Sequence, residues 1–160
     1  MARLVISIYN ILLALWIGGI AIFSFLITPI IFKGFERDTA SAIVDKLFPF
    51  YFPYNLIISL AALVSFLLVA KFQTGIARKL SFALIIAAIV INVFITFKLY
   101  PDIKRTKAAI TSFEHTSSES LERKEFRRLH GISAVLNILL LIDGLSLIVI
   151  NSGRKRLWGN

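Results

Sequence analysis

The stretch Leu121–Ile150, LERKEFRRLHGISAVLNILLLIDGLSLIVI, decides the fold class of this chain. Its first third is charged and the remainder is apolar, with no Pro, so it predicts one helix that enters a membrane from the surface. His130, Ser133 and Asn137 are spaced by three and four residues, which places them on one face at 3.6 residues per turn. Because a polar face on a membrane helix is expected to contact protein and not lipid, this face predicts a polar seam inside a helical bundle.

The composition excludes an ordinary soluble domain. Hydrophobic residues make up 58% of the 160 residues, the mean hydropathy is +0.82, and several uncharged runs are long enough to cross a bilayer. The chain has 0 Cys residues, so disulfides, thiolate metal sites and Cys nucleophiles are excluded. The net charge of +9 comes from basic residues at the ends of the apolar runs, which predicts the lipid bilayer as partner and not nucleic acid.

Four apolar runs predict an all-α polytopic membrane protein, with residues 1–160 forming a single membrane domain. The expected architecture is a bundle of four transmembrane helices with an amphipathic interfacial helix in the first loop. The transmembrane helices are expected at about residues 4–32, 54–71, 77–100 and 117–151, and the interfacial helix at about 39–48.

Local signals mark the ends of these helices. Asp38 is expected to cap the interfacial helix, and Pro49 and Pro53 to end it in a turn lined with aromatic side chains at headgroup level. Pro101 is expected to break or kink the third helix as it leaves the bilayer. The segment Thr116–Glu119 matches a capping box, so the last helix is expected to start near residue 117.

The topology follows from the number of crossings and from the charges. Four crossings place both termini on one side of the membrane. Loops one and three carry eleven of the 18 Lys and Arg residues, which favours a cytoplasmic position for these loops. In the first run, Ala14 and Gly18 form a small-xxx-small pair that allows close helix approach, either inside the monomer or in a homo-oligomer.

Depth in the membrane predicts two further polar contacts. Asn92 and Asn137 each lie six or seven residues from the loop-three end of their helices, roughly 10 Å deep at 1.5 Å per residue, so we expect them to meet. Asn10 and Asp143 have matched depths near the opposite surface and are expected to meet if helices one and four are neighbours. An acid at this depth is costly, so Asp143 is expected to be protonated, hydrogen-bonded or hydrated.

Signatures of soluble enzymes are absent from the sequence. It contains no P-loop, dinucleotide fingerprint, nucleophile elbow or HExxH zinc motif, which argues against an enzyme only modestly, because membrane enzymes often lack such signatures. No metal site is predicted, since His115 and His130 are the only imidazoles and neither has a carboxylate at ligand spacing. The sequence does not indicate which cofactor, if any, the protein binds.

Several segments together resemble a known family. They are Leu13–Gly19 (LALWIGG), Lys46–Phe52 (KLFPFYF), Asn92 followed by Tyr100-Pro101, and Phe126–Ser133 (FRRLHGIS) followed by Asn137. This ordered set is similar to the signature segments of the transmembrane protein 205-like family, the family of domain of unknown function 4149. The resemblance covers nearly the whole chain and implies a four-helix membrane protein of poorly defined biochemistry. For the function it suggests export or trafficking of metal-bearing solutes. Chelation of a soft metal through sulfur does not fit, because the chain has no Cys and only Met1.

Three hypotheses for the function remain open. In the first, the bundle handles or exports a small solute or metal ion along a seam of Asn92, His130, Ser133 and Asn137, with Asn10 and Asp143 as a second polar layer. In the second, the protein is a membrane redox component that binds haem or metal through His130. In the third, it is a scaffold or accessory subunit recognised through its basic third loop.

Overall fold

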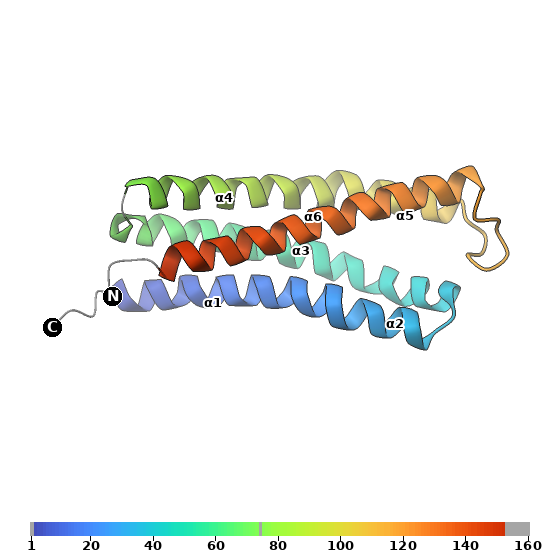
Figure 1. Cartoon of the computed structure of the whole chain (residues 1–160), viewed down its shortest axis with the longest axis horizontal. Helices are drawn as coiled ribbons and strands as arrows, with labels where there is room; N and C mark the ends of the chain where they lie inside the picture. The colour runs from blue at the N-terminus through green and yellow to red at the C-terminus, as the bar shows by residue number, and fades with distance from the viewer. Residues whose placement is uncertain (1, 74, 153–160) are drawn as a thin grey trace.

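The computed structural model describes residues 2–73 and 75–152, and all regular structure in these residues is helical (Figure 1). The first rod contains α1 (Ala2–Ala21), the π-helical segment η1 (Ile22–Ile27) and α2 (Thr28–Gly34). The second contains α3 (Arg37–Val69) and the short 3₁₀ turn η2 (Ala70–Phe72). The third contains α4 (Gly75–Phe94), the π-helical segment η3 (Ile95–Leu99) and α5 (Tyr100–Ala108), and the fourth is α6 (Leu121–Ser152).

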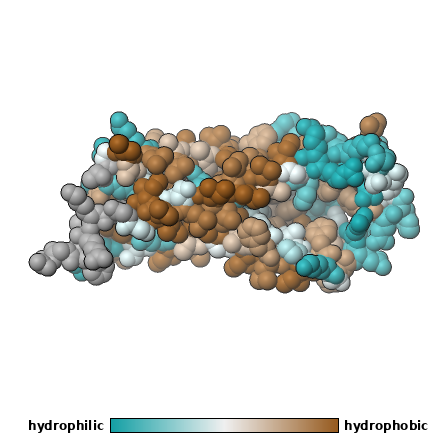
Figure 2. Space-filling view, in the orientation of Figure 1, coloured by the Kyte–Doolittle hydropathy of each residue, from teal (hydrophilic) through white to brown (hydrophobic). Residues whose placement is uncertain are grey.

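Each of the four rods is long and apolar enough to cross a membrane. Hydrophobic side chains cover the middle of the molecule, and hydrophilic ones gather at the end where α2, α5 and the start of α6 lie (Figure 2). Large apolar side chains such as Leu4, Phe25, Val64 and Phe97 are exposed on this surface, as expected where lipid and not water is the solvent. The prediction of an all-α polytopic membrane bundle is confirmed.

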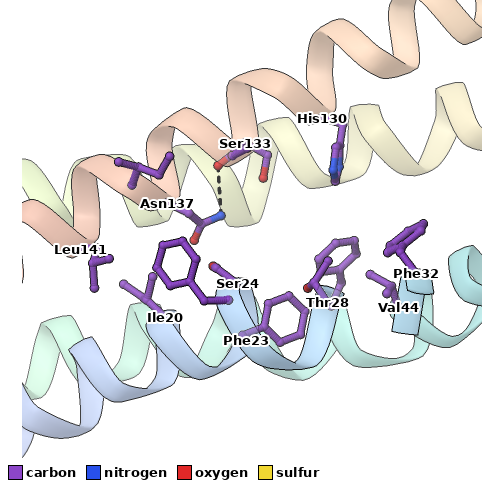
Figure 3. Close-up of a pocket in the computed structure, with 14 residues that line it drawn as sticks. Ile20, Phe23, Ser24, Thr28, Phe32, Val44, His130, Ser133, Asn137 and Leu141 are labelled. Carbon is purple, nitrogen blue, oxygen red and sulfur yellow. Dashed lines mark hydrogen bonds between the residues drawn. The ribbon is translucent and has the colours of Figure 1, made fainter. Parts of the chain in front are cut away.

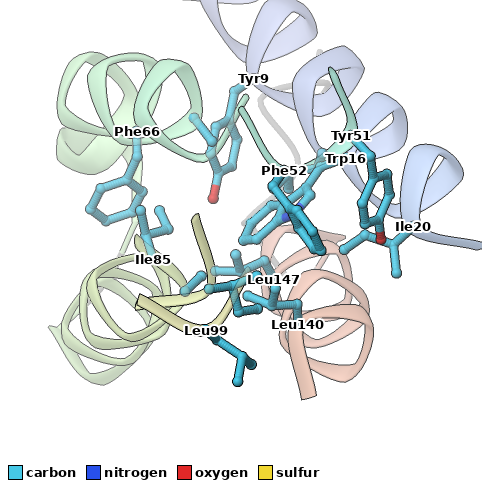
Figure 4. Packing of buried hydrophobic residues seen from close by; sticks show 14 of the residues in the cluster. Tyr9, Trp16, Ile20, Tyr51, Phe52, Phe66, Ile85, Leu99, Leu140 and Leu147 are labelled. Carbon is cyan, nitrogen blue, oxygen red and sulfur yellow. The ribbon is translucent and has the colours of Figure 1, made fainter. Parts of the chain in front are cut away.

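The interior is packed with aromatic and aliphatic side chains from all four rods (Figure 4). α1 packs against α3 and α6, and α4 packs against the same two helices from the other side. Tyr9, Trp16 and Phe66 are fully buried, and Figure 4 shows Leu140 and Leu147 of α6 between the helices at the centre of this core. The first rod and the fourth rod are therefore neighbours, with α1 in contact with α6.

The expected separation of an interfacial helix from the second crossing is wrong. α3 runs without interruption from Arg37 to Val69, through Pro49 and Pro53. A proline withdraws one helix hydrogen bond and its ring crowds the preceding turn, but membrane helices tolerate it where neighbours support them. Here Phe48 and Phe52 stack with ring centroids 5.0 Å apart, and Tyr100 of α5 packs against both. The aromatic segment thus forms part of the bundle interior, and most of it is not an interfacial turn.

Pro101 does not end the third helix either. The π-helical segment η3 ends directly before Tyr100, and Pro101 occupies the first turn of α5. The same arrangement occurs in the first rod, where η1 precedes α2 and Pro29 lies in its first turn. A π-helical turn widens the helix and relieves the clash between a proline ring and the carbonyl four residues earlier. Both rods therefore continue past their prolines.

Loop three, residues 109–120 between α5 and α6, folds onto the start of α3, and this contact replaces the predicted cap. Asp38 does not cap its own helix, because its carboxylate accepts hydrogen bonds from Ser112 Oγ and the Phe113 backbone N–H, both at 2.6 Å. Lys107 Nζ donates to the Ser41 carbonyl at 3.0 Å and forms an ion pair with Asp45. Loops one and three thus form one connected end of the molecule.

The fourth helix begins later than its capping box predicts. α6 starts at Leu121, and the backbone N–H of Arg123 bonds to Ser120 Oγ at 3.3 Å, so Ser120 provides the cap. Ser117 Oγ instead accepts from the Glu119 N–H inside loop three. The Ser-rich segment contains several residues able to cap a helix, and local sequence does not rank them.

Two neighbouring glycines of α1 give a matched test of the packing. A Cβ at Gly19 would lie 2.6 Å from Cε1 of Tyr54, whose hydroxyl donates to the Leu15 carbonyl at 2.8 Å. A Cβ at Gly18 would meet nothing within 4 Å. We expect Gly19→Ala to lower the free energy of unfolding by about 1–3 kcal/mol, the usual cost of overpacking. Thermal unfolding of the purified protein in mild detergent measures the effect.

Gly18→Ala is the control, and it should unfold at the temperature of the parent protein or above it, because Ala favours the helix. Equal destabilisation by both variants would contradict the close Gly19–Tyr54 contact. Since Ala14 is exposed and Gly18 has open space beside it, this pair is not used for packing inside the monomer. Its role in a homo-oligomer stays a prediction.

Candidate functional site

A cavity of about 220 Å³ lies between the second half of the first rod and α6 (Figure 3). It follows α6 from His130 to Leu141, eleven residues or about 16 Å at 1.5 Å per residue. Most of its walls are apolar, and the lining residues on the first rod are Ile20, Phe23, Ser24, Phe25, Thr28 and Phe32. Val44 and Phe48 of α3 close its base, and the α6 wall consists of His130, Ser133, Ala134, Asn137, Ile138 and Leu141.

The predicted polar face of α6 forms one wall of this cavity. His130, Ser133 and Asn137 all line it, and Figure 3 shows them facing the first rod. Asn137 Nδ2 donates to the Ser133 carbonyl at 3.0 Å, one turn earlier on the same helix. Ser133 is buried as a residue, and its hydroxyl forms no hydrogen bond with any described residue, so it is free to bond to a molecule in the cavity.

Tyr51 fixes the orientation of Asn137 from the neighbouring helix. Its hydroxyl donates to Asn137 Oδ1 at 2.8 Å, which links α3 to α6 across the bundle. The Tyr51 ring also stacks on Phe23 of η1, with centroids 4.0 Å apart and an angle of 17° between the planes. Three of the four rods are thereby joined beside the cavity, and Asn137 presents a defined set of polar atoms to it.

The opposite wall carries hydroxyl groups. Ser24 and Thr28 are four residues apart, so they lie on one helix face, and both line the cavity from the first rod. They lie where η1 leads into α2 and Pro29, the part of the rod in which the helix widens. The cavity therefore has polar groups on both sides within a mainly apolar lining.

His130 lies at the loop-three end of the cavity. Its ring stacks on Phe126, one turn earlier on α6, at a centroid distance of 5.8 Å and an angle of 9°. His130 and Phe32 also border a second cavity toward loop three. His130 is thus at the junction of the two cavities. His115, by contrast, is exposed in loop three and lines neither cavity.

Asn92 lies apart from the seam into which the sequence placed it. It is buried in α4, and its Nδ2 lies 3.5 Å from Ser59 Oγ of α3. The expected contact with Asn137 does not form, because Asn137 is engaged by Tyr51 and Ser133. Counting residues along a helix predicts depth, but it leaves open the direction in which each side chain leaves its helix.

The expected pair of Asn10 and Asp143 is also not formed. Asn10 Oδ1 accepts a hydrogen bond from Asn151 Nδ2, eight residues beyond Asp143 on α6. Asp143 is buried beside Gly144, and its Oδ2 has no hydrogen-bond partner among the described residues. The second polar layer therefore consists of an Asn–Asn pair near the helix ends and a separate buried acid.

No group of three or more His, Asp and Glu side chains gathers as a metal site within residues 2–73 and 75–152. His130 is the single imidazole on the cavity wall. The polar atoms that the cavity offers are hydroxyl, amide and imidazole groups. Such a set hydrogen-bonds to a neutral or anionic group of a small molecule.

Four apolar spans around a closely packed core, with a lateral cavity between the first and fourth, define a polytopic integral membrane protein. The model of the family described as "Domain of unknown function (DUF4149)" matches residues 11–112, about two thirds of the chain. The chain belongs to this family. The narrower resemblance to transmembrane protein 205-like proteins stays a prediction from the motifs.

A relative from Aquifex aeolicus (strain VF5), described as an uncharacterized protein, is 30% identical over 139 residues. The alignment covers 87% of this chain and 90% of the relative. No solved structure matches the chain.

Sequence reasoning did not identify several residues that the structure brings to the site. Tyr51, Ser24 and Thr28 line or support the cavity, yet the sequence pattern treats them as an aromatic belt and as ordinary positions of a transmembrane run. The spacing of Ser24 and Thr28 by four residues was a usable signal, since it marks a short polar face in an apolar helix. Tyr51 becomes recognisable only once α3 is known to continue through Pro49 and Pro53.

The Tyr51–Asn137 hydrogen bond can be measured by a double-mutant cycle. We expect a coupling energy of about 0.6–1.7 kcal/mol between Tyr51→Phe and Asn137→Ala, the range found for interhelical hydrogen bonds in membranes. Unfolding in mild detergent would give the four stabilities. Tyr100→Phe is the control, because the Tyr100 hydroxyl forms no hydrogen bond in the described chain. If Tyr100→Phe couples to Asn137→Ala as strongly, the Tyr51 bond is not the cause.

Proposed function

We propose that this protein binds a small, elongated and largely apolar solute that enters the cavity laterally from the bilayer. The observation that carries the proposal is the cavity itself, with an apolar lining interrupted by hydroxyl, amide and imidazole groups on two facing helices. Ligand sites in proteins typically combine such a lining with a few polar groups that fix the orientation of the ligand. His130, Ser133 and Asn137 of the predicted polar seam thus border a cavity in which a solute can bind.

The size of the cavity limits the solute. About 220 Å³ is below the roughly 300–1,000 Å³ of sites that enclose drug-sized ligands. The cavity therefore suits a small molecule or one chain of a larger amphiphile. Phe25 and Ile138 lie on facing walls of the cavity, and their side chains are 62% and 50% exposed on the lipid-facing surface. This exposure supports entry from the membrane and not through a closed channel.

Hydrogen bonding within the seam supports one particular orientation of the solute. Asn137 is held by Tyr51 and by the Ser133 carbonyl, which leaves the Ser133 hydroxyl and the His130 ring as the available polar groups on α6. These groups lie toward loop three, whereas Ile20 and Leu141 at the far end are apolar. The polar end of the solute would lie toward loop three and its apolar end toward the membrane interior.

The metal-ion and haem alternatives have less support from this arrangement. Only one imidazole and no carboxylate line the cavity among the described residues, whereas metal sites usually gather several such ligands. The scaffold alternative has support from the exposed basic residues near loop three, but it gives no role to the cavity.

A long-chain fatty alcohol with a diazirine in its chain is a suitable neutral probe. After photolysis in liposomes, peptides containing Phe25 and Ile138 should be labelled in the parent protein. We expect Ala134→Phe, which places a ring in the cavity, to lower this labelling at least threefold, as measured by mass spectrometry of the digested protein.

Ala87→Phe is the matched control, because Ala87 is exposed on α4 away from the described cavities. It adds the same ring to a lipid-facing position and should leave the labelling unchanged. Labelling that is uniform over all lipid-facing peptides, or equal in Ala134→Phe and the parent, would refute the proposed binding site.

A further inference from the structure

A second cavity, of about 240 Å³, lies at the loop-three end of the molecule, next to the cavity between the first rod and α6, which we call the seam cavity. It is bordered by the end of α2, the start of α3, loop three and the first turns of α6. Its lining residues are Phe32, Arg37, Ser41, Phe113, Arg123, Phe126, Arg127 and His130. Three of these are Arg, and no described carboxylate is among them.

Two of the three Arg side chains of this cavity have no acidic partner in the described chain, unlike three basic residues nearby. Arg128 forms an ion pair with Glu125 at 2.6 Å, Lys124 pairs with Glu119 at 2.7 Å, and Lys107 pairs with Asp45. The side chains of Arg37 and Arg127 form no ion pair or hydrogen bond with any described residue. The cavity therefore has two guanidinium groups available to an anion.

Arg123 and the nearby acids have structural partners. Arg123 donates from one guanidinium nitrogen to the carbonyls of Phe113 and Thr116, at 2.9 and 2.6 Å, which holds loop three while its charge remains at the cavity. Glu114 accepts from the Arg37 backbone N–H at 3.2 Å, and Asp38 accepts from loop three. These two acids lie near the cavity but do not line it.

The two cavities adjoin, since Phe32 and His130 border both. One is cationic and lies at the hydrophilic end of the molecule, and the other is apolar and lies along the membrane-spanning part of α6 (Figure 2, Figure 3). A ligand complementary to both needs an anionic group at one end and an apolar chain at the other. Arg side chains match the oxygens of phosphate groups particularly well, because the guanidinium can donate two parallel hydrogen bonds.

We propose that the two cavities together bind an anionic phospholipid, with its headgroup phosphate between Arg37, Arg123 and Arg127 and one acyl chain in the seam cavity. This inference rests on the proposed function, because the acyl chain is the elongated apolar part of the solute. His130 lies at the junction and can donate a hydrogen bond to the ester or headgroup oxygens. A free phosphate ion would use the cationic cavity alone and leave the adjoining apolar one without a role.

Native mass spectrometry of the detergent-purified full chain can test this binding. The protein is mixed with phosphatidylglycerol or phosphatidylcholine of identical acyl chains, and the retained lipid is counted. We expect at least fivefold greater retention of phosphatidylglycerol by the parent protein. The double variant Arg37→Gln/Arg127→Gln should reduce this preference below twofold, because both unpaired guanidinium groups are lost. Arg123 is left intact, since it also holds loop three.

Arg128→Gln is the matched control on the same helix. It removes one positive charge next to Arg127, but Arg128 is paired with Glu125 and does not line the cavity. It should keep at least a fourfold preference for phosphatidylglycerol. Equal retention of both lipids by the parent protein would overturn the inference, as would an equal loss of preference in Arg128→Gln and Arg127→Gln single variants.

Two further arms identify the source of the binding and separate this inference from the proposed function. Glycerol phosphate, which has the anionic group but no chain, should not compete with phosphatidylglycerol at equal concentration; full competition would indicate a free-anion site instead and refute the lipid. If the neutral diazirine alcohol fails to label the seam cavity, the proposed function fails. If it labels the cavity but the parent protein shows no preference for phosphatidylglycerol, only the present inference fails. Thermal unfolding confirms that each variant is folded.

Discussion

In a bilayer core no water is present to bond to peptide groups, so each backbone N–H and C=O must find its partner within the protein. Four continuous helical rods satisfy this constraint, and the prolines are the places where it is hardest to satisfy. At Pro29 and Pro101 the chain widens into π-helical segments, whereas at Pro49 and Pro53 the helix is supported by stacked aromatic side chains. The π-helical segment η1, which precedes Pro29, also lines the seam cavity, so the widened helix forms part of the candidate site.

The middle of the bundle is a buried core, and the candidate site lies toward loop three. Trp16 of α1 lies fully buried in the packed part, and Gly144 of α6 allows Ile17 to approach, since a Cβ there would lie 2.7 Å from its side chain. Toward loop three, the cavity lies between the first rod and α6. Beside it, the Tyr51 hydroxyl joins α3 to Asn137 of α6. The buried core and the candidate site are thus built from the same four rods.

The sequence predicts the class, the number of spans and the polar face of α6, because hydropathy and the 3.6-residue period determine these features directly. It fails at Pro49, Pro53 and Pro101, because the support that lets a helix pass a proline comes from residues distant in sequence, such as Tyr100 packing on Phe48. It also fails to pair Asn92 and Asn10 correctly. Their depth follows from counting residues, but their partners Ser59 and Asn151 depend on how each helix is rotated about its axis.

The attachment of loop three to the start of α3 has a consequence for the order in which the protein is made. Asp38 and its partners Ser112 and Phe113 are 74 and 75 residues apart in sequence. A ribosome synthesises the chain from its N-terminus, so Asp38 has no partner until the third rod has been completed. Arg123, which holds the same loop, follows later still. The cationic cavity is therefore among the last features to form during synthesis, after three of the four spans have been made.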